Sequence, residues 1–513
     1  MSLSPQQVAS GPGDEAEARR RPAKRKLGVL SVAFLIVAAS APLTVIAGGS
    51  TSAFSVTHVL GIPLGYVVLA VALAIFAVGY AAMSRYITNA GAFYAYVSQG
   101  IGRPAGVGAS IIALIAYNAM QVGIYGMFGF QMSMLVLEKT GVDIPWWVFV
   151  FGCIAVIAWM GVNRVDLSAK VLGVLVALEF AVVIVFDVVA IANPAEGGFS
   201  AAPMSPSELF VPGVGAVLSF GIAAFMGFES AAIYSEESKD PRRTIPRATF
   251  LAVAVIGVFY AISSWALALA IGPDKILDPV GITAEEAGPP LFFGFVAQHL
   301  GVLWVDIMSV LFITSLFAAL VSFHNAVARY IFALGREGVL PSGLASVRSR
   351  SSAPWAGSVV QTIVAIVVVI SFSIGEIGWN PENGPFAVLI LFTWLTNTGA
   401  FGLVLLMALV SVAVVGYFRR DRRGVGIGSR LVAPIIAAVS LAAVAVLILV
   451  NFDVLLGQAE SNALTFLLPA IVVVPGVLAM LWARRLRRTR PDTYRRIGHG
   501  NDDDSARHLG DSD

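Results

Sequence analysis

The chain has 513 residues, of which 58% are apolar and only 12% are charged, and its net charge is +2. A soluble domain carries about twice that share of charged residues, so the composition excludes an ordinary globular enzyme and favours a polytopic membrane protein. The single cysteine, Cys153, excludes an internal disulfide, and the sequence shows no cluster of metal-ligating residues. We therefore expect no metal, no cofactor and no nucleic-acid partner.

Apolar runs recur along the whole chain, and most reach the roughly 20 residues that a helix needs to cross a bilayer. We expect an all-α integral membrane protein with 12 transmembrane helices in one domain, 27–484. The polar tails at 1–26 and 485–513 are expected to be disordered. The apolar segments lie at about 28–56, 62–84, 104–137, 145–163, 167–192, 213–236, 246–271, 300–333, 355–375, 385–417, 430–451 and 463–484.

The basic residues fall almost entirely on one side of this arrangement. Of the 33 Lys and Arg residues, all but Lys139 and Lys275 lie in the tails or in the even-numbered connections. The positive-inside rule then places both termini in the cytoplasm, with the chain in the lipid bilayer of the cell membrane. A basic N-terminus before an apolar run also fits a signal peptide, but the run continues past the small residues at 38–41, which favours a retained first helix.

The first segment contains PLTVIAGGSTSAF at 42–54, in which Pro42, Gly48 and Gly49 interrupt the apolar helix. Glycine is also common where membrane helices pack closely, so the glycine pair alone fits packing as well as a break. The sixth segment offers the matching position, with Gly227 inside an apolar run.

Because the two interrupted segments lie an odd number of spans apart, the second enters from the opposite side of the membrane. This pattern predicts a five-plus-five inverted repeat, over about 27–193 and 212–418, with extra helices at about 429–484. The external connection 272–298 is long enough for a small cap over the outer mouth.

A broken helix survives in a bilayer only where it lines a cavity or is buried in protein. The N–H groups at the start of a half-helix suit a carboxylate, and carbonyls at the opposing end suit an ammonium. We therefore predict that a small solute binds between the two breaks. The predicted substrate-binding residues are Ile46, Ala47, Gly48, Gly49, Ser50, Thr51, Ala224, Phe225, Gly227, Phe228 and Glu229, and Phe220 is a further aromatic candidate to close over the solute.

The stretch GFESAAIYSEESKDPRRTIPRA at 227–248 resembles the sixth-helix signature of the amino acid–polyamine–organocation superfamily. NAGAFYAYVSQGIGRPAG at 89–106 and RYIFALGREGVLPSGLASV at 329–347 are similar to two of its helix connections. The resemblance implies the LeuT-like fold, with ten core helices in two inverted halves plus two more, and carriage of amino acids, polyamines or related amines. The family's usual first-helix pattern is Gly-Ser-Gly or similar, whereas this chain has Ala47 to Thr51 as AGGST.

Two carboxylates stand inside apolar segments. Glu229 follows the sixth-segment break, where it closes the inner gate, contacts the substrate amine or satisfies unwound backbone N–H groups. Glu179 lies midway along the fifth segment, where an ionised carboxyl is costly. By the resemblance this segment flanks the first helix and some relatives have Lys there, so we predict that Glu179 couples transport to protons; a protonated acid bonded to a neighbouring helix is the alternative. Asp187, nearer the outer end, is expected to be interfacial.

Other polar residues suggest weaker assignments. Tyr117, Gln121 and Tyr125 share one face of the third segment and either line a pocket or bond neighbouring helices, the commoner role. By the resemblance, hydroxyls such as Ser315 lie where sodium binds in sodium-coupled members of the fold, but such residues are too common to predict a sodium site. Arg85, Glu236 and Glu237 at the cytoplasmic mouth are gate candidates.

The sequence thus predicts a secondary active transporter that moves an amino acid, proton-coupled or by exchange. A polyamine or amine carrier of the same fold is the first alternative, because Glu229 and Glu179 provide acidic ligands. A channel or a membrane-embedded enzyme is the second, although the sequence contains no P-loop and no catalytic constellation. The substrate, the coupling ion and the oligomeric state stay open.

Overall fold

The computed structural model describes residues 28–87, 93–163, 169–196, 198–229, 238–347, 353–457 and 461–498. The gate candidates Glu236 and Glu237 lie outside these ranges, as do the N-terminal tail and the end of the C-terminal tail. Every secondary-structure element within the ranges is a helix.

Eleven of the described helices are long and apolar enough to cross a membrane, which makes the chain a multi-pass membrane protein. The sixth predicted segment contains the shorter apolar helix α10, after which residues 230–237 lie outside the described part. The first span consists of α2 (Val29–Ser40), a π-helical turn η1 (Thr44–Ser50) and α3 (Thr51–Thr57). The other ten are α4 (Ile62–Ser84), α6 (Arg103–Thr140), α7 (Trp146–Asn163), α8 (Ala169–Ala192), α11 (Pro241–Ile271), α14 (Val302–Arg336), α15 (Trp355–Gly375), η6 with α16 (Ala387–Phe392, Thr393–Arg420), η7 with α17 (Gly428–Val432, Ala433–Val450) and α19 (Ala463–Thr489). The shorter helix α10 spans Val214–Phe225.

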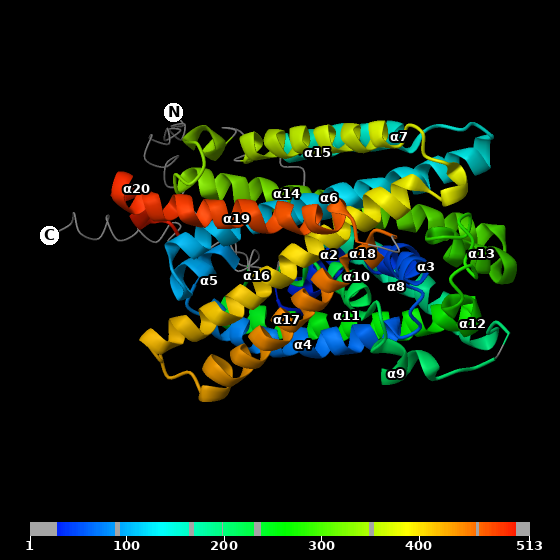
Figure 1. Ribbon diagram of the computed structural model, residues 1–513, viewed down its shortest axis with the longest axis horizontal. Coiled ribbons are helices and arrows are strands. Elements are labelled where there is room, and N and C mark those ends of the chain that lie inside the picture. The colour runs from blue at the N-terminus through cyan, green and yellow to red at the C-terminus, as the bar shows by residue number, and fades with distance from the viewer. Residues whose placement is uncertain are drawn as a thin grey trace, which may run out of the picture.

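Short helices join the spans at both ends of the molecule, and Figure 1 shows α5 and α20 at one end and α9, α12 and α13 at the other. The connecting helices are α5 (Phe93–Gly100), η2 (Ala202–Met204), α9 (Pro206–Leu209), α12 (Pro273–Leu277), α13 (Pro289–Leu300), η4 (Ser342–Ala345), η5 (Pro381–Asn383) and α18 (Phe452–Leu455). The short helix α20 (Pro491–Arg496) follows the last span. The end with α5 and α20 carries the arginines of the α16–α17 connection.

Helices from the two halves of the chain pack on each other in matching pairs. Extensive contacts join α4 to α11, α6 to α14 and α7 to α15. If α10 is counted as the sixth span, these pairs join the second span to the seventh, the third to the eighth and the fourth to the ninth. Each pair therefore joins helices that hold the same position in the order of the two halves. An inverted repeat would produce these pairings, and the repeat itself stays a prediction.

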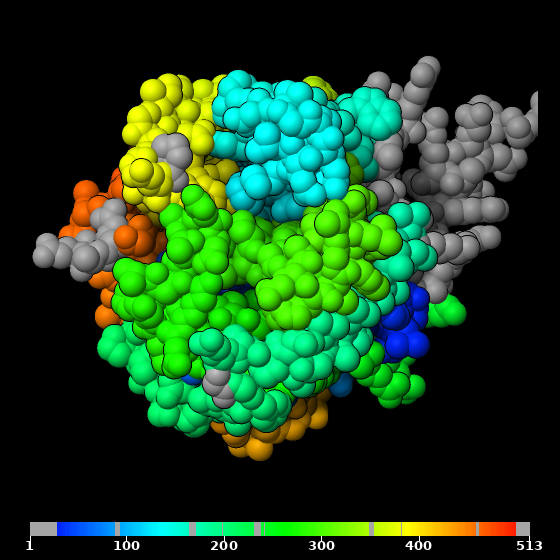
Figure 2. Space-filling view, turned by 90° about the vertical axis from the view of Figure 1, so that its right-hand side faces the viewer, coloured from blue at the N-terminus to red at the C-terminus, as the bar shows by residue number. Residues whose placement is uncertain are grey.

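The α11–α14 connection forms a cover at the end opposite α5 and α20, where α12 and α13 lie over the middle of the face seen in Figure 2. The Gly288 N–H donates to Ser55 Oγ at 3.1 Å, which attaches this cover to α3. Lys275 Nζ lies 2.8 Å from Glu286 Oε2, and this hydrogen bond holds the pKa of Glu286 below its ordinary value.

The first span is interrupted at Ala41, beside Pro42 and before the glycine pair. Ala41 has a φ of 47°, and the helix resumes at Pro42 and continues to Thr57. Proline has no N–H and disfavours the helical conformation of the residue before it, so Pro42 accounts for the break. Of the three residues predicted to interrupt the helix, Pro42 lies at the break, whereas the prediction is wrong for Gly48 and Gly49, which lie in a helical stretch.

Gly48 has a packing role instead. A Cβ at Gly48 would lie 3.2 Å from Met127 Cε and from Phe312 Cζ, so the glycine lets the first span approach α6 and α14. Glycine commonly has this role where membrane helices pack closely.

The sixth segment breaks where the sequence predicts. Helix α10 ends at Phe225, and Gly227 has a φ of 112°, which an L side chain rarely adopts. A Cβ on Gly227 would lie 3.1 Å from the Cβ of Ala39, beside the first break. The two interruptions therefore meet in the interior of the protein.

We expect Gly215→Ala to weaken the contact between α10 and α17. A Cβ at Gly215 would lie 1.9 Å from the Leu447 carbonyl oxygen, so the two helices must separate. Overpacking of this kind typically costs about 1–3 kcal/mol. Thermal unfolding of the purified protein in detergent measures the effect, with Gly152→Ala as the control because a Cβ there meets nothing within 4 Å. Equal unfolding temperatures for the two variants would contradict this tight contact.

Candidate functional site

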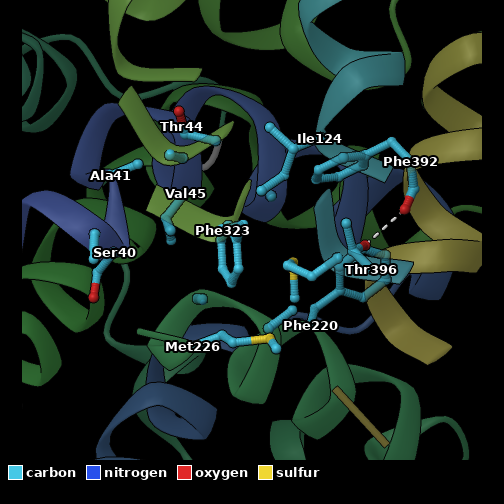
Figure 3. A pocket seen from close by; sticks show the side chains of 16 residues that line it. Ser40, Ala41, Thr44, Val45, Ile124, Phe220, Met226, Phe323, Phe392 and Thr396 are labelled. Atoms are coloured by element: carbon cyan, nitrogen blue, oxygen red, sulfur yellow. Dashed lines mark hydrogen bonds between the residues drawn. The ribbon is translucent and has the colours of Figure 1, made fainter. Parts of the chain in front are cut away.

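A small cavity of about 50 Å³ lies where the two helix breaks meet. Its wall comes from the first span, α6, α10, α14 and the η6–α16 span. In Figure 3 the Phe323 ring points into the space between Val45, Phe220 and Met226. The lining residues are Ala39, Ser40, Ala41, Thr44, Val45, Gly49, Met120, Ile124, Phe220, Ala223, Ala224, Met226, Ala319, Phe323, Phe392 and Thr396.

The cavity wall is apolar with a few hydroxyls. Ser40, Thr44 and Thr396 supply the hydroxyl groups, and Thr396 donates to the Phe392 carbonyl at 2.7 Å. Among the described residues that line the cavity, none has an ionisable side chain. The walls therefore suit an apolar group, and any charged group of a solute must be met by hydroxyls or by the backbone.

The backbone offers two helix ends of opposite polarity to this space. The helix that resumes at Pro42 has the positive end of its dipole there, and within its first turn the Leu43 N–H is bonded to Glu179 and the Val45 N–H to the Ala41 carbonyl. Helix α10 ends at Phe225, so its last carbonyls and the negative end of its dipole face the second break. Thr44 from the first end and Ala224 from the second both line the cavity. The arrangement matches a solute with a carboxylate and an ammonium.

Side chains from neighbouring helices satisfy the backbone at the first break. The Leu43 N–H donates to Glu179 Oε2 at 3.2 Å, and the Tyr260 hydroxyl donates to the Ser40 carbonyl at 3.0 Å. Glu179 comes from α8 and Tyr260 from α11. The break thus keeps its shape because the surrounding helices replace the hydrogen bonds that a continuous helix would make.

Glu179 is also linked to the cavity wall. The Ser315 hydroxyl donates to Glu179 Oε2 at 2.8 Å, and the Thr44 hydroxyl donates to Ser315 Oγ at 3.1 Å. Thr44 lines the cavity, whereas Glu179 and Ser315 do not. The acid is therefore separated from the cavity by two hydroxyl groups in a continuous hydrogen-bonded chain.

Glu229 has both carboxyl oxygens engaged by the protein. The Tyr117 hydroxyl donates to Oε1 at 2.6 Å, and the Gly227 N–H donates to Oε2 at 2.9 Å. The Tyr80 hydroxyl donates to the Glu229 carbonyl at 3.2 Å. The side chain is 2% exposed and does not line the cavity. This geometry is that of an acid holding the unwound backbone.

Of the predicted binding residues, Gly49 and Ala224 line the cavity, and so does the aromatic candidate Phe220. Gly227 forms the second break. The Ser50 hydroxyl is hydrogen-bonded to the Tyr66 hydroxyl. The Thr51 hydroxyl donates to the Ala47 and Gly48 carbonyls of its own helix. The predicted residues outside the wall are Ile46, Ala47, Gly48, Ser50, Thr51, Phe225, Gly227, Phe228 and Glu229. A role for these in substrate binding stays a prediction.

Several functional neighbours escaped the sequence reasoning. Thr44 and Tyr260 carried no motif, although Pro42 beside Thr44 was a signal for the true position of the break. Asp187 is buried, and the Ser263 hydroxyl of α11 donates to its Oδ2 at 2.7 Å, so its position at the membrane interface stays a prediction. The polar face of α6 bonds neighbouring helices, since Gln121 donates to the Leu320 carbonyl and accepts from Gln361. Arg85 is exposed at the end of α4.

Comparison with known proteins finds a matching family, described as amino acid permease, whose profile covers residues 27–477. A branched-chain amino acid permease of Lactococcus lactis is 27% identical over 330 residues, which is 60% of this chain and 68% of the relative. A low-affinity putrescine importer of Escherichia coli is 25% identical over 62% of this chain and 68% of its own length. An L-asparagine permease of Salmonella typhimurium is 24% identical over 55% of this chain and 56% of its own length.

We expect Tyr117→Phe and Glu229→Gln to destabilise the protein in a coupled way. The two side chains share one hydrogen bond, and such a bond contributes about 1 kcal/mol. The double variant should therefore lose less thermal stability than the sum of the two single variants. Thermal unfolding temperatures of the four proteins measure this coupling.

The control is a distant pair, Tyr117→Phe with Glu376→Gln, because Glu376 bonds Trp146 instead. Their effects should add. Additive losses for Tyr117 and Glu229 as well would contradict a structural role for this hydrogen bond.

Proposed function

Because the chain belongs to the amino acid permease family, we propose that it is a secondary active transporter of an α-amino acid with an apolar side chain. The observation that carries this proposal is the cavity, which has apolar walls and lies between a helix N-terminus and a helix C-terminus. Membrane transporters commonly bind solutes at such interrupted helices. In this proposal the protein moves the solute across the membrane and does not change it chemically.

The proposed pose places the substrate carboxylate at the start of the helix after Ala41, near the Thr44 hydroxyl. The ammonium then meets the last carbonyls of α10, near Ala224. The substrate side chain packs against Ile124, Phe220 and Phe323. The carboxylate position lies a few residues before the Gly48 to Thr51 segment predicted from the sequence, because the break itself lies earlier.

A diamine carrier is the competing function, and the similarity to a putrescine importer gives it weight. A diamine has two cationic ends, so it requires acids or several carbonyls as ligands and gains nothing from a helix N-terminus. Both candidate acids, Glu179 and Glu229, are bonded to the protein and lie outside the cavity wall. The arrangement therefore favours a zwitterionic amino acid.

The cavity must widen when the substrate binds. Its volume of about 50 Å³ is far below the roughly 300 Å³ at which ordinary ligand pockets begin. The α2–α3 span contains a break and α10 ends at one, so these are the elements that we propose change shape, while α6, α8 and α14 form the frame around them. We take alternating access to be a movement of the broken helices against this frame.

Glu179 is the proposed site of proton coupling. It lies at the N-terminus of the same half-helix that would receive the substrate carboxylate, and Thr44 and Ser315 connect the two positions. Two negative charges at one helix end repel each other, so substrate binding and proton binding favour each other. Proton and amino acid would then move together.

The orientation follows from the charges at the two ends. The end with α5 and α20 carries the arginine-rich connections, and the opposite end carries Lys139 and Lys275. We propose that the basic end faces the cytoplasm and that the protein resides in the cell membrane.

A counterflow assay in proteoliposomes tests the substrate class. Vesicles loaded with unlabelled leucine should accumulate labelled leucine, and external valine, isoleucine or phenylalanine should compete. Asparagine should compete poorly because the walls offer few polar partners, and putrescine should not compete. Strong competition by putrescine alone would replace the amino acid function by the diamine function, and flux without saturation would indicate a channel.

We expect Glu179→Gln to remove the stimulation of leucine uptake by an inward proton gradient while counterflow persists. Glutamine keeps the size of the side chain but cannot exchange a proton. The control is Asp187→Asn, which alters a buried acid of the same helix that has no bond to the first break. Full gradient dependence in Glu179→Gln would refute the coupling role and leave the substrate assignment untouched.

A further inference from the structure

A cluster of arginines surrounds a hollow at the basic end of the molecule, between the end of α4 and the start of α11. The hollow has a volume of about 400 Å³. It is lined by Arg85, Tyr86, Arg242, Arg243, Pro246 and Arg247, so four of its six lining residues are arginines. All four arginine side chains are exposed, and the hollow is therefore open to the surroundings.

The described acids do little to neutralise this cluster. Asp240 Oδ2 lies 3.7 Å from Arg243 Nε, and both side chains are largely exposed, so the pair contributes little energy. Arginine presents a planar fork of donors that matches phosphate oxygens. Several such forks around one hollow form a site for a phosphate group rather than for a neutral solute.

A second hollow, of about 340 Å³, adjoins the first and shares Arg85, Tyr86 and Pro246 with it. Its further wall is apolar where Val78 and Ala81 of α4 face Phe250 of α11. Phe250 is 37% exposed although it lies within a membrane-spanning helix. The two hollows together have one cationic part and one apolar part, which is the chemistry of a phospholipid with its headgroup and the start of its acyl chain.

The α16–α17 connection closes the far side of the second hollow. Arg423 lines it, with its guanidinium 4.8 Å from the Tyr86 ring centre. The Tyr86 hydroxyl donates to the Arg423 carbonyl at 3.3 Å, so α4 and this connection are already joined beside the hollow. A ligand seated here would touch α4, α11 and the connection at once.

We propose that these two hollows bind one anionic phospholipid, with its phosphate among Arg85, Arg242 and Arg247 and its acyl chain along α4 and α11. Phosphatidylglycerol is the representative headgroup, since it has one net negative charge and no competing ammonium. The site does not depend on the identity of the transported solute. It would hold together α4 and α11, the helices that pack against α10 and α2 respectively.

The test compares two variants that each remove two positive charges at the basic end. Arg242→Gln/Arg247→Gln alters the hollow, and Arg484→Gln/Arg488→Gln alters exposed arginines of α19 that line neither hollow. Native mass spectrometry of the purified full-length protein counts retained phosphatidylglycerol during titration. We expect the first variant to bind about thirtyfold more weakly, since each arginine near a membrane surface adds substantially to anionic lipid binding. The second variant should bind like the wild type.

Further arms identify the ligand. Thermal unfolding with phosphatidylglycerol, phosphatidylcholine or glycerol phosphate should show stabilisation by the first alone, and the hollow variant should lose it. Stabilisation by glycerol phosphate would show a soluble phosphate site and overturn the lipid assignment. Equal effects of both lipids, or equal losses in both variants, would also overturn it. Monodisperse elution of each variant in phosphatidylcholine shows that it has folded.

Discussion

Two helix ends inside a bilayer impose the constraint on which this structure depends. Each unpaired backbone group in such surroundings costs several kcal/mol, so a broken helix persists only if other groups take the missing hydrogen bonds. Glu179 and Tyr260 do this at the first break, and Glu229 and Tyr80 do it at the second, where Tyr117 holds the Glu229 carboxyl. The buried acids are therefore first of all part of the architecture. Their presence in apolar helices follows from the breaks.

The frame around the breaks explains why the cavity itself has so little polarity. Because the neighbouring helices satisfy the backbone from behind, the face toward the cavity is left to apolar side chains such as Phe220, Ile124 and Phe323. In the proposed pose, the remaining polar groups of the helix ends are those that a solute would meet. A zwitterion fits this division, since it replaces the first-turn and last-turn partners that the broken helices lack.

The sequence was sufficient to predict a multi-pass helical membrane protein, because apolar length is a strong signal that does not depend on packing. It also located Gly227, since a glycine followed closely by an acid inside an apolar helix is typical of an unwound segment. At the first break it named Pro42 together with Gly48 and Gly49, because the choice between packing and unwinding depends on Met127 and Phe312 from distant helices. For the same reason Thr44 and Tyr260 were missed and the bond from Ser315 to Glu179 was not predicted, as these contacts exist only once four helices are assembled.

The hydrogen bonds that hold the first break also connect a titratable group to the cavity wall. Glu179 accepts two bonds at Oε2, from the Leu43 N–H and the Ser315 hydroxyl. A proton on Oε1 leaves both partners in place, but hydrogen bonds to a neutral carboxyl are weaker than those to an ionised one. The Ser315 hydroxyl also accepts the bond from Thr44 at the cavity wall. Under the proposed coupling, the protonation of Glu179 would therefore act on the substrate position through these bonds and through the loss of a negative charge at the same helix end.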